Sequence, residues 1–400
     1  MTAALQAITV EDTAALAGLP YSWEATAAPD ASPTAGPAWL HATDDIDPRI
    51  PPCRYLVARG GPGELAALPM HLIEAPTTPD ADPRSYFGGS SANPAEQVCC
   101  GSQQASPAGQ ILAGLTDSEA FPALLLGSLP GYKTEILHSY WTPQLAADLI
   151  DAALAYAREQ HVATIIAPWV ADRGSGKAVA RELARRGAVA SYWAAEDYMP
   201  LRHGSMQEHL AAARSRDRYR YRQDMLAAQA LGLSVRTLTT AELRSSLPRI
   251  GALAAATRHR HGQDIADTEI PTVLARLLDR EVPLRCVGGF RHGQLVACCV
   301  SVEKAGRIYA KHAGFDYPTL GTRSGALFAV VIYGTLAAAY DRRARVIEYG
   351  IGAHQAKALR GCQPRAVTSY LLTGQPRTRD LFTAAAVAYA PVRRAEYAAP

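Results

Sequence analysis

The chain contains the stretch Val346-Ile-Glu-Tyr-Gly-Ile-Gly352, followed at 353–364 by AHQAKALRGCQP. Its apolar start predicts a short buried strand. The two glycines predict a turn, because glycine adopts a positive φ and lets a ligand approach the backbone closely. The residues that follow predict a helix whose first N–H groups can face an anion. A strand, a glycine turn and a helix therefore place a candidate functional site around Lys357.

The length and composition indicate a globular protein of more than one domain. A chain of 400 residues is too long for one ordinary hydrophobic core, so we expect two domains, 1–200 and 201–400. Hydrophobic residues make up 48% of the chain and charged residues 19%, which excludes a disordered or fibrous protein. The net charge of +3 is low for a nucleic-acid-binding domain, so any contact with RNA has to come from a local basic patch.

Seven cysteines, including the pairs Cys99-Cys100 and Cys298-Cys299, show no spacing typical of a metal site or a disulfide framework. We expect reduced, buried thiols and no metal. The N-terminus has no basic segment followed by an apolar run, and the longest apolar stretch, 325–340, is too short to span a bilayer. These features predict a cytoplasmic protein without a membrane span.

The pattern strand, loop, helix, strand occurs twice in the chain. Its segments are 163–170, 177–186 and 187–193 in the first copy, and 345–350, the helix around Lys357 and 366–371 in the second. An amphipathic helix precedes each copy, at 143–160 and 323–341, and the last strands share Ala-Val-x-Ser-Tyr at 188–192 and 366–370. We interpret this as an internal duplication that yields two mixed α/β domains in tandem. The alternative is two chance occurrences of a common supersecondary unit.

The remainder of the second half alternates helices and strands in a clear order. Helices are predicted from 205 towards 232, near 241–260 and near 270–280, and strands at 233–238, 283–290, 294–303 and 307–314. The order of the second half is thus helix, helix, three strands, helix, strand, helix, strand.

The most basic segment of the chain is 211–222, with the sequence AAARSRDRYRYR. On a helix, its arginines at i, i+4 and i+8 share one face, and tyrosines lie between them: Arg214, Arg218 and Arg222, with Tyr219 and Tyr221. Such a surface suits phosphates and stacked bases. The alternative is a solvated basic face held by Asp217 and Asp224.

Two further groups are candidates for proton transfer. His312, on the strand that also carries Tyr309 and Lys311, is either a general base or a packed histidine. Glu348 lies among apolar residues, so burial is expected to raise its pKa and suit it to accept a proton; the alternative is a structural ion pair. Lys357 is either solvated or stabilises an acyl oxyanion or a phosphate, and we expect it to share a cleft with Glu348.

These motifs resemble those of the FemAB-like acyltransferases, tandem members of the GNAT superfamily. The resemblance rests on Lys357-x-x-Arg360-Gly361-x-x-Pro364, on the basic helix ahead of Leu231-Gly232-Leu233, on the strand 308–314 and on the GNAT-like element order. It covers about residues 197–372. It implies that Lys357 approaches the acyl donor or acceptor. The turn from Gly350 to Lys357 is one residue longer than the family pattern and has His354 where an acid is common.

The identity of the acyl donor depends on the loop at 318–326. In GNAT proteins that use coenzyme A, a Gln/Arg-x-x-Gly-x-Gly/Ala loop holds the pyrophosphate. The stretch PTLGTRSGA does not fit that pattern, which disfavours acetyl-CoA, although Arg323 keeps anion binding open.

The sequence therefore predicts an aminoacyltransferase that moves an amino acid from aminoacyl-tRNA to an amine or hydroxyl of a small molecule, in secondary-metabolite or peptidoglycan-precursor biosynthesis. The alternatives are an N-acyltransferase that uses an acyl-CoA or carrier-protein thioester, and a non-catalytic binding protein. The predicted catalytic residues are Glu348, Lys357 and His312. The residues expected to bind the donor or the substrate are Arg214, Arg218, Arg222, Tyr309, Lys311, Arg323, Gly350, Gly352 and Arg360.

Overall fold

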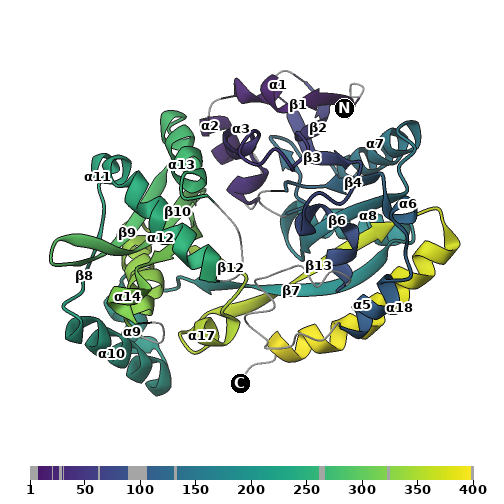
Figure 1. Ribbon diagram of the computed structural model, residues 1–400. Helices are drawn as coiled ribbons and strands as arrows, with labels where there is room; N and C mark the ends of the chain where they lie inside the picture. Colours follow the sequence, from purple (N-terminus) through teal and green to yellow (C-terminus); the bar gives the residue numbers. More distant parts are fainter. Residues whose placement is uncertain are drawn as a thin grey trace. The chain divides into compact units, whose positions relative to one another are not determined.

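The computed structural model describes residues 8–19, 21–26, 29, 31–61, 64–88, 106–129, 133–260, 266–321 and 325–397. The chain divides into two compact units (Figure 1). The first holds the residues up to Ala194 and those from Ala366 to Ala398, and the second holds Ala195–Arg365. Among the described residues, no helix is both long and apolar enough to cross a bilayer.

The first unit is built on a mixed sheet. Its strands are β1 (Thr9–Asp12), β2 (Arg54–Arg59), β3 (Leu65–Ile73), β4 (Ala123–Leu126), β5 (Leu137–His138), β6 (Thr164–Ala171) and β13 (Gln363–Leu372). They lie in the order β1-β2-β3-β4-β6-β13, with β5 on β3. β4 and β6 are parallel, and the neighbouring pairs are antiparallel.

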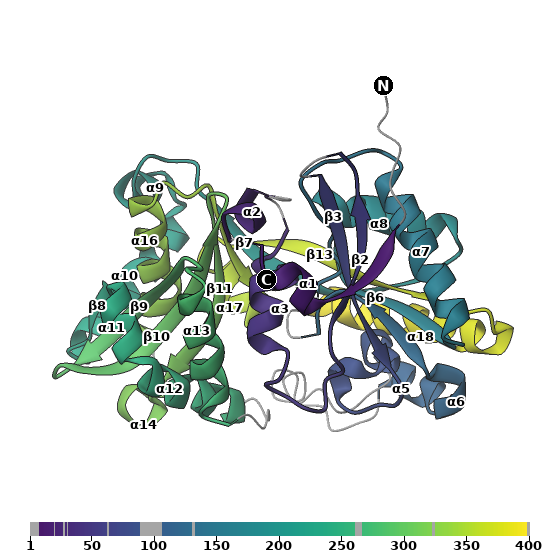
Figure 2. The same ribbon diagram turned by 90° about the horizontal axis from the view of Figure 1, so that it is seen from above.

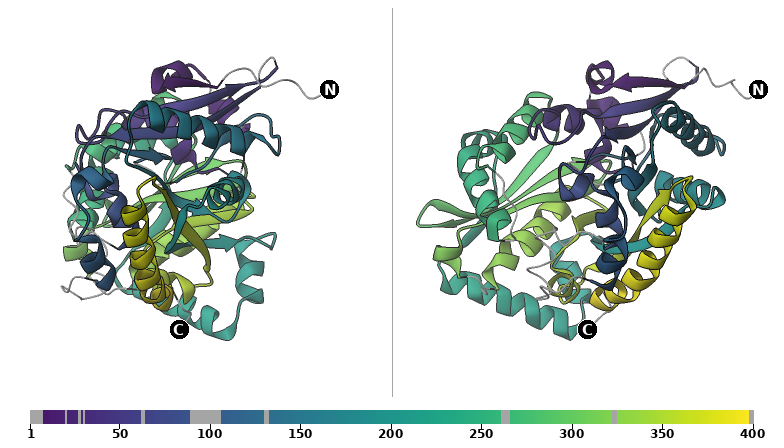
Figure 3. Two further views of the ribbon diagram at one scale, coloured as in Figure 1. Left: turned by 90° about the vertical axis from the view of Figure 1, so that its right-hand side faces the viewer. Right: turned by 45° about the vertical axis from the view of Figure 1, so that its right-hand side comes forward.

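Helices cover both faces of this sheet. They are α1 (Thr13–Ala17), α2 (Tyr21–Thr26), α3 (Pro37–Thr43), α5 (Pro107–Leu112), α6 (Asp117–Ala120), α7 (Leu145–Glu159), α8 (Gly174–Arg185) and α18 (Pro376–Tyr397), with the 3-10 turns η1 (Pro33–Ala35), η2 (Pro79–Ala81) and η3 (Pro83–Phe87). Side chains alternate along β2: Leu56 packs in the cluster that contains Leu149 of α7, and Tyr55 in the one that contains Leu40 of α3. The long helix α18 runs beside α5 (Figure 3).

The second unit has a sheet of the same kind. Its strands are β7 (Val189–Pro200), β8 (Ser234–Thr237), β9 (Leu284–Arg291), β10 (Gln294–Lys304), β11 (Arg307–Phe315) and β12 (Val346–Gly350). They lie in the order β7-β12-β11-β10-β9-β8, with β11 and β12 parallel and the other pairs antiparallel. The predicted strands 283–290, 294–303, 307–314 and 345–350 are thus confirmed to within a few residues.

Helices also cover both faces of the second sheet. They are α9 (Met206–Ala212), α10 (Ser215–Ala230), α11 (Thr240–Ser245), α12 (Leu247–Arg260), α13 (Glu269–Asp279), α14 (Tyr317–Leu320), α15 (Ala326–Phe328), the π-helical η4 (Ala329–Gly334), α16 (Thr335–Asp341) and α17 (His354–Ala358). In Figure 2, α12 and α13 lie on one side of the sheet and α10 and α16 on the other. A methyl group on Gly314 would collide with α12 at Leu253, whereas one on Gly289 would collide with Val330 of η4.

The strand order confirms the duplication. In each unit four strands form an antiparallel run, the fourth strand is parallel to a fifth, and the fifth is antiparallel to a last strand. The last strands are exchanged. β7, which follows α8, pairs with β12 of the second unit, and β13, which follows α17, pairs with β6 of the first.

Because of this exchange, the two compact units do not coincide with the predicted domains 1–200 and 201–400. The first crossing, at Ala194, lies close to the predicted boundary. Residues 366–398, assigned from the sequence to the C-terminal domain, instead belong to the first unit. A periodicity pattern identifies a strand but not the strand with which it pairs, because its backbone N–H and C=O groups can be satisfied in either sheet.

Candidate functional site

In the first unit, Thr134 lies between the parallel strands β4 and β6, beyond their last paired residues. β4 and β6 pair as far as Leu125 and Ile166. Beyond that point the Thr134 hydroxyl donates to the carbonyl oxygens of Leu126 and Pro168, and the Thr134 N–H donates to the Pro168 oxygen at 3.2 Å.

In the second unit, the turn after β12 has the predicted form. Gly350, Gly352 and Ala353 have φ values of 65°, 82° and 49°, and α17 begins at His354. A methyl group on either glycine would meet nothing within 4 Å. The glycines therefore serve the positive φ and not a close backbone approach. Ala353, a non-glycine residue in the left-handed region, marks the turn as held by its surroundings.

Lys357 stabilises this turn through hydrogen bonds to its backbone. Its buried Nζ donates to the carbonyl oxygens of Tyr349, Gly350 and Ile351 at 3.0–3.1 Å, and lies 3.5 Å from Oδ2 of Asp197. Burial lowers the pKa of Lys357, and the charge of Asp197 opposes that shift. An ammonium group has three N–H donors, and all three of them already bond to backbone carbonyls. A contact with an oxyanion would have to replace one of these bonds.

Asp197 joins this turn to β7 and was not identified from the sequence. Its Oδ1 lies 2.7 Å from Nδ1 of His354, and its side chain is fully buried. Burial raises the pKa of Asp197, while Lys357 and then His354 pull it back. The sequence marked His354 only as a departure from the family pattern. No local signal linked it to a residue so far away in the chain.

The structure does not bring Glu348 and Lys357 into one cleft. Glu348 is the cross-strand partner of Tyr198, whereas Lys357 contacts Asp197, the preceding residue of β7. Successive strand residues point to opposite faces, so the two groups lie on different faces of the sheet. The Glu348 carboxylate instead pairs with Arg307 at 2.7 Å and Arg365 at 3.0 Å. This is the structural ion pair that the sequence left as the alternative.

A basic pocket of about 330 Å³ lies in the second unit, among the end of β7, α9, the start of α10, α16 and the segment after α17. Its polar lining includes Arg202, His203, His209, Arg214, Asp217, Tyr333, Arg360 and Gln363, and its apolar lining includes Met199, Leu210 and Leu336. Arg202 and Arg214 form no ion pair with any residue that the structure describes. Burial, and next the charge of His203, lowers the pKa of His209.

Arg360 enters this pocket as a fixed cation. Its guanidinium donates to both oxygens of Asp224, at 2.7 and 2.9 Å, and to the Ala356 carbonyl, and it stacks on the Phe328 ring at 3.4 Å. The predicted role of Arg360 in binding thus fits its position. Tyr333 comes from η4, and a single π-helical turn within a longer helix is frequent at functional sites.

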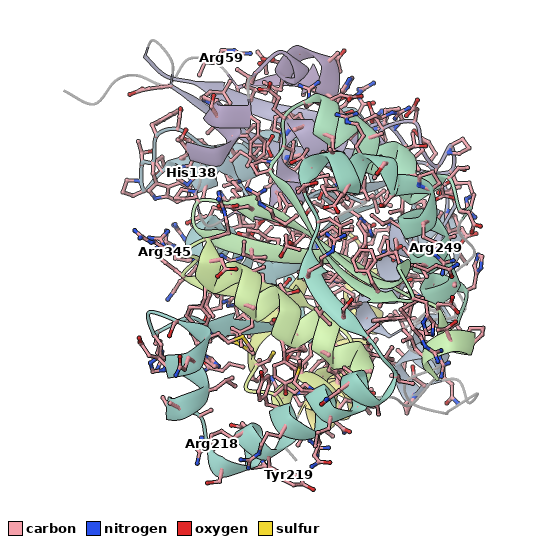
Figure 4. All side chains as sticks on the ribbon, turned by 90° about the vertical axis from the view of Figure 1, so that its left-hand side faces the viewer. Arg59, His138, Arg218, Tyr219, Arg249 and Arg345 are labelled. Carbon is pink, nitrogen blue, oxygen red and sulfur yellow. The ribbon has the colours of Figure 1, made fainter. Side chains whose placement is uncertain are left out.

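The basic helix is broken where the sequence predicted continuity. α9 ends at Ala212 and α10 starts at Ser215, so Arg214 is an extended N-cap residue in the pocket wall. Arg218 is not free for a ligand, because its guanidinium donates to the carbonyl oxygens of Ala211 and Ala213 at the end of α9. Arg222 is exposed, and Figure 4 shows Arg218 and Tyr219 along the outer edge of α10.

The other predicted residues lie elsewhere. Burial, followed by the charges of Arg258 and Lys311, lowers the pKa of His312 to about 3, which makes it a poor general base near neutral pH. Tyr309 is buried in β11 beside Glu348 in register. None of the three residues 309, 311 and 312 lines the basic pocket. Arg323 falls outside the described residues.

The described part of the chain contains no cluster of potential metal ligands. Its cysteines, Cys53, Cys286, Cys298, Cys299 and Cys362, are buried and unpaired, as expected. Cys99 and Cys100 lie outside the described residues.

Comparison with known families places this chain in one of them. A family described as FemAB-like, of peptidoglycan biosynthesis and recognition, matches residues 127–391. The chain belongs to the FemAB-like family. The match includes the pocket, the turn after β12 and both exchanged strands. No curated protein sequence matches this FemAB-like chain.

Solved structures share its architecture at low sequence identity. FemX is 10% identical with a TM-score of 0.52, covering 92% of this chain and 96% of FemX. A domain described as the C-terminal part of a lysylphosphatidylglycerol synthetase from Agrobacterium fabrum is 8% identical with a TM-score of 0.50, covering 87% and 90%. A tandem GNAT protein from the clavulanic acid pathway is 14% identical with a TM-score of 0.44, covering 93% and 99%. FemX and the Agrobacterium fabrum domain thus share the fold of this chain, and the FemAB-like family supports a transferase.

Proposed function

We propose that this FemAB-like chain moves an aminoacyl group from aminoacyl-tRNA to an amine or hydroxyl of a small molecule, and that the second unit carries the site. The observation that carries this proposal is the basic pocket at the start of α10, where Arg202 and Arg214 form no ion pair with a described residue and Arg360 is held by Asp224. Cations without an ion-pair partner in a concave site attract an anionic ligand.

The exposed side of α10 extends this basic surface beyond the pocket. Arg222 and Tyr219 are exposed on it, and the Tyr219 side chain is 55% accessible. An arginine and an aromatic ring in alternation suit a phosphate chain with unstacked bases. The tRNA strand would then follow α10, with its aminoacylated end at the pocket.

The transfer itself needs orientation and a hydrogen-bond donor more than a strong base. The acceptor nitrogen attacks the ester carbonyl, the bond to the ribose oxygen breaks, and that oxygen takes the proton that the nitrogen loses. An ester is already activated, so positioning supplies much of the rate. The Tyr333 hydroxyl lies in the pocket wall near the Asp224 carboxylate, and it makes no hydrogen bond of ordinary geometry among the described residues. Burial, and next the charge of Asp224, raises its pKa, so it stays protonated and can donate to the developing oxyanion.

Lys357 contributes to this reaction indirectly, by holding a segment of the site in place. It holds the turn after β12, and α17 follows that turn and leads to Arg360. We assign Lys357, Asp197 and His354 to the support of this segment, and Arg360 and Tyr333 to the ligand.

One assay separates the donors. The whole chain is incubated with an amine mixture and either radiolabelled aminoacyl-tRNA, labelled acetyl-CoA or a labelled carrier-protein thioester. We expect label transfer from aminoacyl-tRNA, a loss of about 10²-fold in turnover for Tyr333→Phe, and unchanged turnover for Tyr192→Phe, a tyrosine of the first unit. Transfer from a thioester only would favour the N-acyltransferase, and no transfer from any donor would favour a binding protein.

Salt dependence of tRNA binding tests the role of α10. Arg222→Gln removes an exposed cation and should lower the slope of log K against log salt by about one. Arg244→Gln is the matched control, because Arg244 pairs with Asp279 on α13, away from the pocket lining. An equal slope in both variants would show that α10 does not contact the donor.

A further inference from the structure

The turn that joins α16 to β12 is strongly basic. Its sequence at 341–345, DRRAR, contains three arginines and one aspartate, so its formal charge is +2. Arg342 pairs with Glu303 at 3.2 Å. Arg343 and Arg345 are exposed and form no ion pair with a residue that the structure describes. Neither of them lines the basic pocket.

The fold does not require the side chain of Arg343. This residue has a φ of 53° and directly follows Arg342, the C-cap of α16. Glycine is the preferred residue at such a position, because it adopts the left-handed conformation without a steric cost. A cation near the end of α16 is favourable next to the helix dipole, but Arg342 already supplies one. The guanidinium of Arg343 is thus available to a ligand.

Arg345 has a fixed position at the end of the second sheet. Its guanidinium donates to the Ala305 carbonyl at 2.8 Å, and a methyl group on Gly306 would approach its Nε to 3.3 Å. In Figure 4, Arg345 points outward from this end of the sheet. A guanidinium has five N–H donors, so the bond to Ala305 leaves others for an anion.

Two contacts connect this turn to the basic pocket. The N–H of Leu201, which precedes the pocket residue Arg202, donates to the Arg345 carbonyl at 2.8 Å. The Tyr340 hydroxyl, near the end of α16, lies 2.9 Å from Nδ1 of His209 in the pocket wall. The cations of the turn therefore extend the basic surface from the pocket to the end of the sheet.

We propose that this turn docks a paired stem of RNA, with Arg343 and Arg345 on its phosphates. A guanidinium in a fixed position suits the phosphates of a duplex, which occur at regular intervals and are recognised through the shape of the helix. The assignment of this stem to the aminoacyl donor rests on the proposed function, but the binding of a duplex does not.

The apolar residues of the second unit favour a duplex over other anionic partners. Among the described residues, the large apolar side chains that are exposed all lie outside 341–345. A bilayer would find no apolar group to bury at this turn, and unpaired bases would find no aromatic ring on which to stack.

Three probes test this choice of partner. They are an RNA hairpin with a paired stem, a single-stranded RNA of equal length, and vesicles of phosphatidylcholine and phosphatidylserine. Fluorescence anisotropy of each labelled RNA with the whole chain gives the slope of log K against log salt. Arg343→Gly and Arg345→Gln should each lower the slope for the hairpin by about one and leave the slope for the single strand unchanged.

Three outcomes would overturn the proposal. The first is an unchanged hairpin slope in both variants, and the second is an equal reduction for the hairpin and the single strand. The third is a variant effect on vesicle binding, measured by sedimentation, without an effect on the hairpin.

Arg343→Gly separates binding from a structural role. Because glycine suits the left-handed turn, the urea midpoint of this variant should equal or exceed that of the wild type while its hairpin affinity falls. The matched control is Arg379→Gln, which removes an exposed cation of α18 that has no ion pair among the described residues. An equal fall in the slope of the control would show a general effect of net charge and contradict the assignment to this turn.

The docking surface and the proposed function fail separately. With aminoacyl-tRNA, the double variant Arg343→Gly, Arg345→Gln should raise KM and leave kcat unchanged, because a contact with the stem stabilises the bound substrate and the transition state alike. Weaker hairpin binding without any transfer from aminoacyl-tRNA would contradict only the transfer. Transfer with the KM of the wild type would contradict only the docking of the donor at this turn.

Discussion

Asp197 and His354, 157 residues apart in the sequence, form a buried hydrogen bond of 2.7 Å that joins β7 to the first residue of α17. Lys357 lies against the other oxygen of the same carboxylate and clamps the turn from Tyr349 to Ile351. The strand that leaves the first repeat is thus tied to the turn of the second repeat.

Lys357→Met should destabilise the second unit by about 3–5 kcal/mol, because it removes three hydrogen bonds and leaves Asp197 charged and buried. Urea unfolding measures this change. Lys177→Met, at an exposed lysine of α8, should stay within about 0.5 kcal/mol of the wild type. Adding Asp197→Asn to Lys357→Met should recover part of the loss. A double variant no more stable than the single one would contradict the coupling.

Glu348→Gln should lower the free energy of unfolding by about 1.5–3 kcal/mol, since its carboxylate joins Arg307 and Arg365 in a buried ion pair. We expect the pH profile of turnover to keep its shape, because both carboxylate oxygens of Glu348 are paired with arginines. Glu281→Gln, at an exposed glutamate, is the control. A shifted pH profile in a stable Glu348→Gln protein would restore the catalytic role that the sequence suggested.

We expect His312 to lower the stability of the folded protein in mild acid. Its pKa is about 3 in the folded protein against 6.5 for an ordinary histidine, so the unfolded chain binds this proton first. The sign is therefore unfavourable: as the pH falls below 6.5 towards 3, stability falls by up to about 1.4 kcal/mol per pH unit from this group. Urea unfolding of the wild type and His312→Asn between pH 7 and pH 4 measures the difference. Parallel curves would show that His312 titrates normally.

Removal of residues 366–400 should unfold the first unit locally, although these residues begin with the last strand of the second repeat. β6 would lose β13, which pairs with it from Val367 to Leu372, and α18 would no longer bury Phe382 against Phe87. Hydrogen exchange should accelerate in β6 and stay slow in β10. The control is a chain that ends at Tyr397. Equal protection of β6 in both chains would contradict the exchange of strands.

Much of the fold was predictable because it depends on local patterns. A capping box located the start of α11, and the alternation of apolar residues located β9, β10 and β11 close to their observed bounds. The single helix predicted near 241–260 is two helices, α11 and α12. The break between α9 and α10 was missed, because no proline or glycine marks it. Arg214 is extended there, and Arg218 caps the end of α9, a contact that helical periodicity does not encode.

The candidate site was less predictable from the same patterns. Arg214 and Arg360 do line the pocket, whereas Glu348 lies in an ion pair and His312 is buried away from it. Asp197 and Tyr333 were not identified, and Asp217 was named only as a partner of the basic face. A carboxylate or hydroxyl has a recognisable role only when its neighbours are known, and those neighbours come from other elements.

The sequence by itself determined the repeated strand, turn and helix, the positive φ of the turn at Gly350 and Gly352, and the resemblance to the FemAB-like family. These follow from glycine conformation, side-chain periodicity and short motifs, all of which act within a few residues of the chain. Tertiary structure alone decided that β7 and β13 change places and that Asp197 meets His354. It also set Asp217 among the arginines of one pocket, because strand pairing and charge pairing depend on distances in space that the spacing of residues along a chain does not specify.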